Sequence, residues 1–197
     1  MIHIQPFHGW QAEQYIEELA RLRIEVFRDF PYLYDGDMDY ETQYLKTLID
    51  APDNFIVMAF NGSEVVGAAT GLPLAHETFN ISQPIEQGGY NIDTIYYLGE
   101  SIIRKPYRSN GINTRFFQAA EHRAKSLGEY EFLAFCNIER SPDHPASPEH
   151  YAEPRKHWCS LGFQPTDIIC NISWKDLQES TASPKNLRFW IKSIDPR

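Results

Sequence analysis

One stretch of the chain joins an apolar segment to an amphipathic one through a short basic turn. The apolar segment covers residues 94–103, and the turn after it contains Arg108 and Gly111. The amphipathic segment then runs to Gly128, a residue type that often ends helices. This order predicts a strand over 94–103, a sharp turn and a helix over 109–127. A strand that leads directly into a helix is typical of a sheet covered by helices.

The start of the predicted helix is a candidate site for an anion. The first N–H groups of a helix have no acceptor within it, and the helix dipole favours negative charge there. The turn has neither the G-x-G-x-x-G pattern of dinucleotide-binding folds nor a P-loop sequence, because Gly111 stands alone. We therefore expect a pyrophosphate site of another kind.

The other segments predict one mixed α/β domain over residues 1–197. Asn61-Gly62 between two apolar runs indicates a hairpin, and residues 130–136 are apolar at most positions, as in a buried parallel strand. This length suits a single core. Residues 76–92 fit either a short helix or a loop. The remaining predicted elements are strands at 2–5, 55–60, 64–70, 168–174 and 187–194, and helices at 11–28, 40–49 and from Pro154 to Gly162.

Composition disfavours several partners. The formal net charge of −9 disfavours nucleic-acid binding and is compatible with a cationic amine substrate. No apolar run reaches the length of about 18 residues that a membrane span needs, and the N-terminus lacks a signal pattern. The three cysteines are widely spaced and odd in number, which argues against a disulfide framework. We expect a cytoplasmic protein with no membrane partner.

No segment predicts a metal site. The D-x-D-x-D spacing that starts at Asp35 resembles a calcium loop, but Tyr40 stands where glycine is required and Lys46 where glutamate is required. The histidines lack the i, i+4 spacing of a zinc-binding helix.

The turn also carries a family resemblance. Arg108-x-x-Gly111-x-Asn113 resembles the acyl-CoA-binding signature R/Q-x-x-G-x-G/A of the GNAT superfamily of N-acyltransferases. His157-Trp-Cys-Ser-Leu-Gly-Phe163 is similar to the Y-x-x-x-G-F segment of that family. The resemblance implies a GNAT-like single domain with a mixed, mostly antiparallel central sheet and helices on both faces. It also implies acetyl-CoA or another acyl-CoA as co-substrate, with no metal.

The resemblance places the co-substrate along the end of the strand and the turn. Two positions depart from the family pattern. The side chain of Asn113 replaces a small residue and would either crowd a phosphate or donate to it. Trp158 replaces the family tyrosine, and an indole cannot act as a general acid at neutral pH. The implied cofactor-binding residues are Ile102, Ile103, Arg108, Ser109, Asn110, Gly111, Ile112, Asn113 and Thr114.

Glu100 is the candidate general base. It interrupts an apolar strand, and removal of a carboxylate from water makes it a stronger base. The family often has a glutamate on this strand, while the alternative is a solvent-facing or ion-paired residue. Gly99 beside it predicts a β-bulge. We choose Tyr151 as the proton donor over His150 and Cys159. The alternatives are that Tyr151 is an exposed loop aromatic and that the thiolate leaves without a dedicated acid.

Residues of the loop between the first two helices are candidates for acceptor binding. Tyr32, Tyr34 and Asp35 offer aromatic faces and negative charge to an ammonium group. The alternative is a solvated turn in which Asp39 caps the next helix.

The residues and the resemblance together favour transfer of an acetyl or short acyl group to an amine of a small-molecule or peptide acceptor. The first alternative is a non-catalytic acyl-CoA-binding or regulatory domain, which Asn113 and Trp158 motivate. The second is an acyl-homoserine-lactone synthase, because Arg23-x-x-x-Phe27 before an acidic loop resembles that family. The sequence leaves a monomer and a homodimer open.

Overall fold

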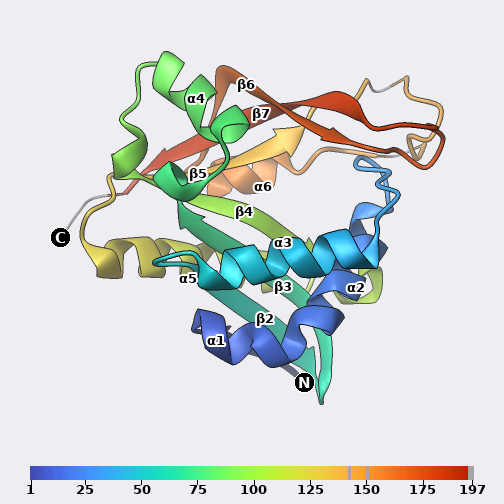
Figure 1. Cartoon of the computed structure of the whole chain (residues 1–197), viewed down its shortest axis with the longest axis horizontal. Helices are drawn as coiled ribbons and strands as arrows, with labels where there is room; N and C mark the ends of the chain where they lie inside the picture. The colour runs from blue at the N-terminus through green and yellow to red at the C-terminus, as the bar shows by residue number, and fades with distance from the viewer. Residues whose placement is uncertain (142, 150, 195–197) are drawn as a thin grey trace.

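A seven-stranded sheet in the order β1-β2-β3-β4-β5-β7-β6 forms the centre of the molecule (Figure 1). The structure is a computed structural model that describes residues 1–141, 143–149 and 151–194. Of the described strand pairs, β4 and β5 run parallel and the others antiparallel. The strands are β1 (Ile2–Phe7), β2 (Phe55–Asn61), β3 (Glu64–Pro73), β4 (Ile95–Ile103), β5 (Phe132–Ile138), β6 (Gln164–Trp174) and β7 (Ser183–Ser193).

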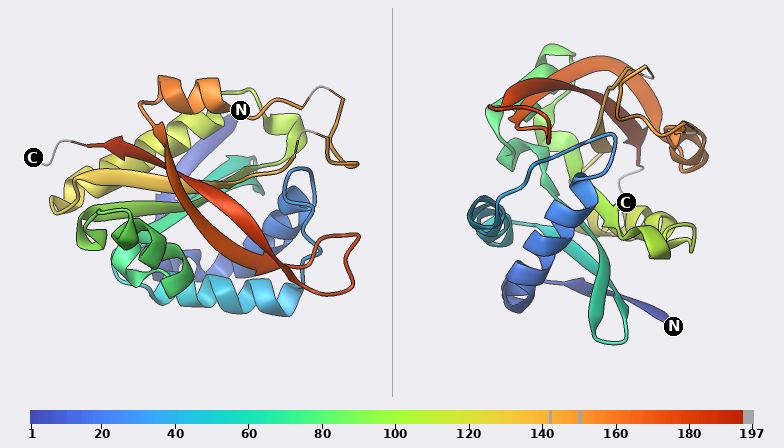
Figure 2. Two further views of the ribbon diagram at one scale, coloured as in Figure 1. Left: turned by 90° about the horizontal axis from the view of Figure 1, so that it is seen from above. Right: turned by 90° about the vertical axis from the view of Figure 1, so that its right-hand side faces the viewer.

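Helices cover both faces of this sheet (Figures 1 and 2). One apolar core lies under the first four helices and a second lies under α5 and α6. The predicted mixed, mostly antiparallel sheet with helices on both faces is confirmed. In the described ranges, no helix is long and apolar enough to cross a membrane. The helices are α1 (Gly9–Ala12), α2 (Ile16–Phe27), α3 (Met38–Asp50), α4 (Phe79–Gln87), α5 (Ile112–Leu127) and α6 (Arg155–Ser160), with short 3₁₀ turns η1 (Glu13–Tyr15), η2 (Leu74–His76), η3 (Ile92–Thr94) and η4 (Lys105–Tyr107).

Three predicted helices differ from those observed. The helix expected over 11–28 is divided into α1, η1 and α2. Both helices pack on α3, but α1 also packs on β2, whereas α2 also packs on β3 and β4. The helix expected from residue 109 begins at Ile112, after two left-handed residues. The helix near Pro154 has six residues, fewer than expected, and Pro154 lies at its cap.

Strands β4 and β5 pair over only part of their length. Their parallel pairing joins residues 95–97 to residues 132–134, and no further pairing between them occurs in the described ladder. On the other side of β4, Thr70 pairs with Glu100 and Gly71 pairs with Leu98, which leaves Gly99 without a partner. The predicted bulge at Gly99 is therefore confirmed. Along the second half of β4, the side that faces β5 is not paired with β5.

Candidate functional site

The chain passes from β4 to α5 through a left-handed turn. Ser109 has φ of 68° and Gly111, the cap of α5, has φ of 70°. Among the residues that the structure describes, none accepts a hydrogen bond from the backbone N–H groups of residues 109–114. A Cβ at Gly111 would meet no described atom within 4 Å. The turn thus presents a row of free donors, with open space at Gly111.

Arg108 braces the end of β4. Its Nε donates to the carbonyl of Ile103 at 2.9 Å, and its Nη2 lies 3.4 Å from a carboxylate oxygen of Asp29. Lys105 Nζ lies 2.9 Å from the other oxygen of Asp29. The two basic side chains near the turn are therefore linked through one carboxylate, and the Arg108 side chain remains 42% exposed.

Asn113 turns its side chain toward β4 and α6. Its Nδ2 donates to Ser101 Oγ at 2.8 Å, and its Oδ1 lies 2.9 Å from His157 Nε2. Both polar atoms of the amide are engaged within the protein, so the side chain is not available to a phosphate in this conformation. The network ties α5 and α6 to the half of β4 that β5 leaves unpaired.

Glu100 lies on the face of β4 that α2 and α3 cover. It is buried together with Arg23 of α2 and Glu41 of α3. Arg23 Nη1 forms an ion pair with Glu100 Oε2, and Arg23 Nε forms one with Glu41 Oε2. The expected removal of Glu100 from water is confirmed, and the alternative of an ion-paired residue holds as well.

Several acceptor atoms in this cluster remain unused. Within residues 1–141, 143–149 and 151–194, no hydrogen-bond partner is found for Glu41 Oε1, Thr70 Oγ1 or either Glu100 oxygen, apart from the Arg23 ion pair. One guanidinium faces two carboxyl groups and can neutralise the charge of only one of them. Because a buried charge is costly without a partner, the cluster favours a cationic group nearby.

Sequence reasoning missed the partners of Glu100, although a signal for them existed. Arg23 is four residues from both Leu19 and Phe27, on the apolar face that identified the first long helix. Glu41 lies four residues before Leu45 on the apolar face of α3. A charged residue on such a face is buried, and a buried charge needs an opposite one.

The three candidate acceptor residues of the loop lie in different surroundings. Burial is the main cause that raises the pKa of Tyr34, followed by the neighbouring Glu41 carboxylate. Burial also raises the pKa of Tyr32, and the Cys136 thiol adds to this effect. Asp35 forms a 2.6 Å ion pair with Lys175, which lowers its pKa. Tyr34 therefore belongs to the Glu100 cluster, Tyr32 lies near β5, and Asp35 is engaged elsewhere.

Tyr151 lies on the loop between β5 and α6. Its side chain packs against Phe30, with ring centroids 4.7 Å apart, and the residue is 38% exposed. Burial and the charge of Glu153 raise its pKa, and Tyr151 in turn contributes to the raised pKa of Tyr32. The two tyrosines therefore face a common region beside β5.

Glu77, just after η2, is a further carboxylate on this face. Burial raises its pKa, while a 3.0 Å hydrogen bond from the Thr78 N–H partly offsets that effect. Its charge influences the pKa values of Tyr44 and Tyr97. The sequence did not single it out, because it lies in the segment left open between helix and loop.

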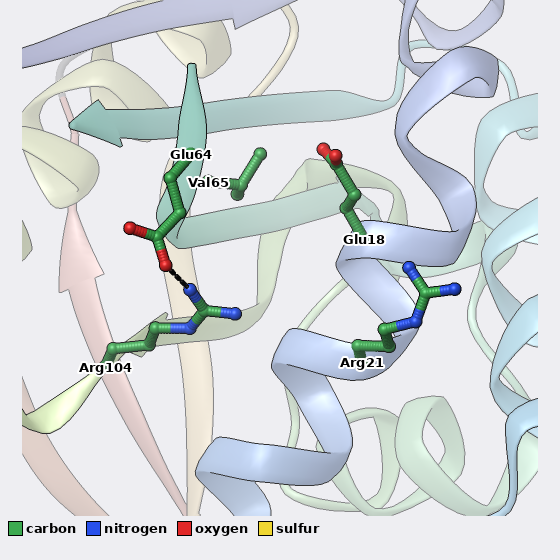
Figure 3. Close-up of a pocket in the computed structure, with 5 residues that line it drawn as sticks. All are labelled: Glu18, Arg21, Glu64, Val65 and Arg104. Atoms are coloured by element: carbon green, nitrogen blue, oxygen red, sulfur yellow. Dashed lines mark hydrogen bonds and ion pairs between the residues drawn. The ribbon is translucent and has the colours of Figure 1, made fainter. Parts of the chain in front are cut away.

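A pocket of about 160 Å³ between α2 and the β2–β3 hairpin lies apart from these groups (Figure 3). None of the predicted site residues lines it. Arg104 there pairs with Glu64 and with Glu25. In the described part of the chain, no group of three or more His, Cys, Asp or Glu side chains is placed to hold a metal ion. The pocket is lined by Glu18, Arg21, Glu64, Val65 and Arg104.

Solved acetyltransferases have the same fold. A GNAT-family acetyltransferase from Staphylococcus aureus Mu50 is 13% identical, with a TM-score of 0.63, and the match covers 99% of this chain and 100% of that one. An aminoglycoside 6'-N-acetyltransferase complexed with coenzyme A is 16% identical, with a TM-score of 0.60 and coverage of 99% and 98%. A ribosomal-protein-alanine N-acetyltransferase from Brucella melitensis is 14% identical, with a TM-score of 0.61 and coverage of 98% and 99%. No curated protein matches the chain.

The chain therefore has the mixed α/β fold of these structures. The chain also matches the acetyltransferase (GNAT) family over residues 15–152, which is more than half of its length. It belongs to this family.

Proposed function

We propose that this protein transfers an acetyl or other short acyl group from acyl-CoA to an amine of a small molecule or peptide. The observation that carries the proposal is the row of free N–H groups at residues 109–114, at the start of a 16-residue helix. Such donors, with the helix dipole behind them, favour a diphosphate. The aminoglycoside 6'-N-acetyltransferase of the same fold was solved with coenzyme A.

The co-substrate would lie along the β4 edge and the turn. The pantetheine arm would lie along the half of β4 that β5 leaves unpaired, beside Ile102 and Ile103, where the Ile103 carbonyl already accepts a hydrogen bond from Arg108. Asn113 contributes its N–H only, since its side chain is engaged by Ser101 and His157. The diphosphate would be held by Arg108, Ser109, Asn110, Gly111, Ile112, Asn113 and Thr114.

The acceptor would approach β4 as a cation, from the face that α2 and α3 cover. Glu41, Glu77 and Glu100 face this region against the single guanidinium of Arg23. Tyr32, Tyr34 and Asp35 are the proposed acceptor-binding residues of the loop, which α3 follows. An excess of negative charge attracts an ammonium group and increases its local concentration.

In the proposed reaction, the acceptor nitrogen attacks the thioester carbonyl, a C–N bond forms and the C–S bond breaks. Glu100 takes the proton of the ammonium through one water molecule, because neither of its oxygens reaches the surface. Tyr151 gives a proton to the departing thiolate and regains one from the second proton that the acceptor nitrogen loses as the amide forms. The products are the N-acylated acceptor and free CoA.

Two matched glycine variants test the co-substrate site. Gly111→Asp places a carboxylate against the diphosphate, whereas Gly128→Asp makes the same change at the left-handed glycine that ends the same helix. In calorimetry, we expect Gly111→Asp to weaken acetyl-CoA binding by about 100-fold, because charge-assisted hydrogen bonds contribute a few kcal/mol. Gly128→Asp should bind as the parent does. Equal affinities in all three proteins would contradict the assignment.

A turnover assay separates the enzyme from the non-catalytic alternative. The parent protein is mixed with acetyl-CoA and a panel of diamines, amino sugars and peptides, and released thiol is measured. Amine-dependent thiol release supports acyl transfer. Tight acetyl-CoA binding without thiol release from any amine would favour a binding module.

A further inference from the structure

We propose that Arg23 and Glu41 are positioning residues that set how readily Glu100 takes up a proton. This inference rests on the proposed function, in which Glu100 accepts the proton of the amine. The contacts are direct, because Arg23 pairs with Glu41 through Nε and with Glu100 through Nη1. The two carboxylates therefore share one guanidinium.

The cluster holds the guanidinium in one place. Arg23 lies over the ring of Tyr44 at 4.4 Å and near that of Phe27 at 5.3 Å. The Arg23 side chain is 11% exposed, and those of Glu41 and Glu100 are 1% and 3% exposed. Little solvent screens these charges, so each has a strong effect on the others.

Because Arg23 is shared with Glu41, its effect on the proton affinity of Glu100 is reduced. A guanidinium bound to one carboxylate alone would keep that carboxylate ionised and make it a poor base. Glu41 offsets part of the positive charge of Arg23, and its own negative charge disfavours a second one nearby. Glu100 consequently retains affinity for a proton despite its ion pair. Glu41 acts through Arg23 and does not need to touch the acceptor.

Other titratable groups surround the cluster on the elements packed against it. Tyr34 from the loop and Tyr44 from α3 have raised pKa values and stay neutral near pH 7. Glu77, after η2, acts on Tyr44 as a negative charge. These groups add negative charge or none, so they reinforce the effect of Glu41 rather than that of Arg23.

The test is a titration of the Glu100 carboxyl by NMR in protein labelled with ¹³C at glutamate carboxyls. The Glu100 signal is assigned as the one missing in Glu100→Gln. In Glu41→Gln, we expect its titration midpoint to fall by about one pH unit, because Arg23 then serves Glu100 alone. The acid limb of kcat/KM should move in the same direction. Glu86→Gln on the exposed side of α4 is the matched control and should change neither.

Two further variants keep the inference testable if Glu41→Gln folds poorly. Glu41→Asp keeps the charge and should leave the Glu100 midpoint within about 0.3 units of the parent value. Arg23→Lys replaces the fork with a point charge that can serve only one of the two carboxylates, so the Glu100 midpoint should move away from the parent value. An unchanged midpoint in Glu41→Gln and Arg23→Lys would overturn the inference.

The NMR readout does not depend on turnover. Absence of thiol release with a shifted midpoint would refute the proposed function and leave the electrostatic coupling intact. Turnover with an unshifted midpoint would refute the coupling and leave the function intact.

Discussion

Glu100 is the residue on which the proposed chemistry depends most directly. Glu100→Gln removes the proton acceptor but keeps the size of the side chain. We expect kcat to fall by about 100-fold or more, the usual contribution of a general base. Acetyl-CoA affinity should stay within about twofold, because the turn at residues 109–114 does not contact Glu100. Stopped assays for kcat and calorimetry for binding measure the two effects. A rate equal to that of the parent would exclude Glu100 as the base.

Glu179, unlike Glu100, is a carboxylate whose charge stabilises the folded state. Hydrogen bonds from Lys185 and Ser183 lower its pKa to about 2. A depressed pKa means that the folded state is favoured above the ordinary value of 4.5, and that this contribution disappears as the pH falls toward about 2. Glu179→Gln should therefore lower Tm at pH 7 and leave Tm unchanged near pH 2. A constant Tm difference between parent and variant across this range would refute the linkage.

The sequence predicted the surroundings of individual candidate residues better than it predicted the partners of those residues. Glu100 and Gly99 were identified because a glutamate and a glycine interrupt an apolar strand, and both the burial and the bulge are observed. The ion pairs to Arg23 and Glu41 join segments that lie far apart in the chain. A pattern within one helix indicates that a charge is buried, but not which residue compensates it.

Helix α5 shows how local sequence specifies an element and its ends. Gly111 and Gly128 both have positive φ and flank the helix. The sequence predicted a turn at Gly111 and a helix end at Gly128. The first residue of α5 was not predicted, because Ser109 also adopts a left-handed conformation. A serine does not usually indicate such a conformation. Residues 9–27 form two helices that share α3 as a neighbour but pack on different strands, which periodicity alone does not show.

The C-terminal glycine of α5 allows an element-scale prediction. Gly128 has φ of 78°, a conformation that costs a residue with a Cβ about 1 kcal/mol. Gly128→Ala should therefore lower the free energy of unfolding by about 1 kcal/mol in urea titrations. Ala119→Ser, within the same helix, is a control with no φ constraint. No loss in Gly128→Ala would show that this residue is not left-handed in solution.

At the scale of the whole molecule, an aromatic cluster joins the sheet to α6. Trp158, the residue at the family tyrosine position, is 6% exposed. Its ring centroid lies 4.9 Å from that of Trp190 on β7 and 5.1 Å from that of Phe135 on β5. The indole therefore packs α6 against the face of the sheet that α5 also covers. His157 on the same helix forms a hydrogen bond with Asn113 of α5. The departure from the family pattern is explained by packing.

This role separates stability from catalysis at one position. Trp158→Ala should lower the free energy of unfolding by about 3–5 kcal/mol, because a large buried side chain is removed. Trp158→Phe keeps most of the aromatic contact and should lose less, while kcat stays within about twofold of the parent value. Urea unfolding and the thiol-release assay measure both quantities. If Trp158→Phe is stable but has lost its turnover, the indole N–H takes part in the reaction, and Tyr151 is then not the sole candidate for the group that meets the thiolate.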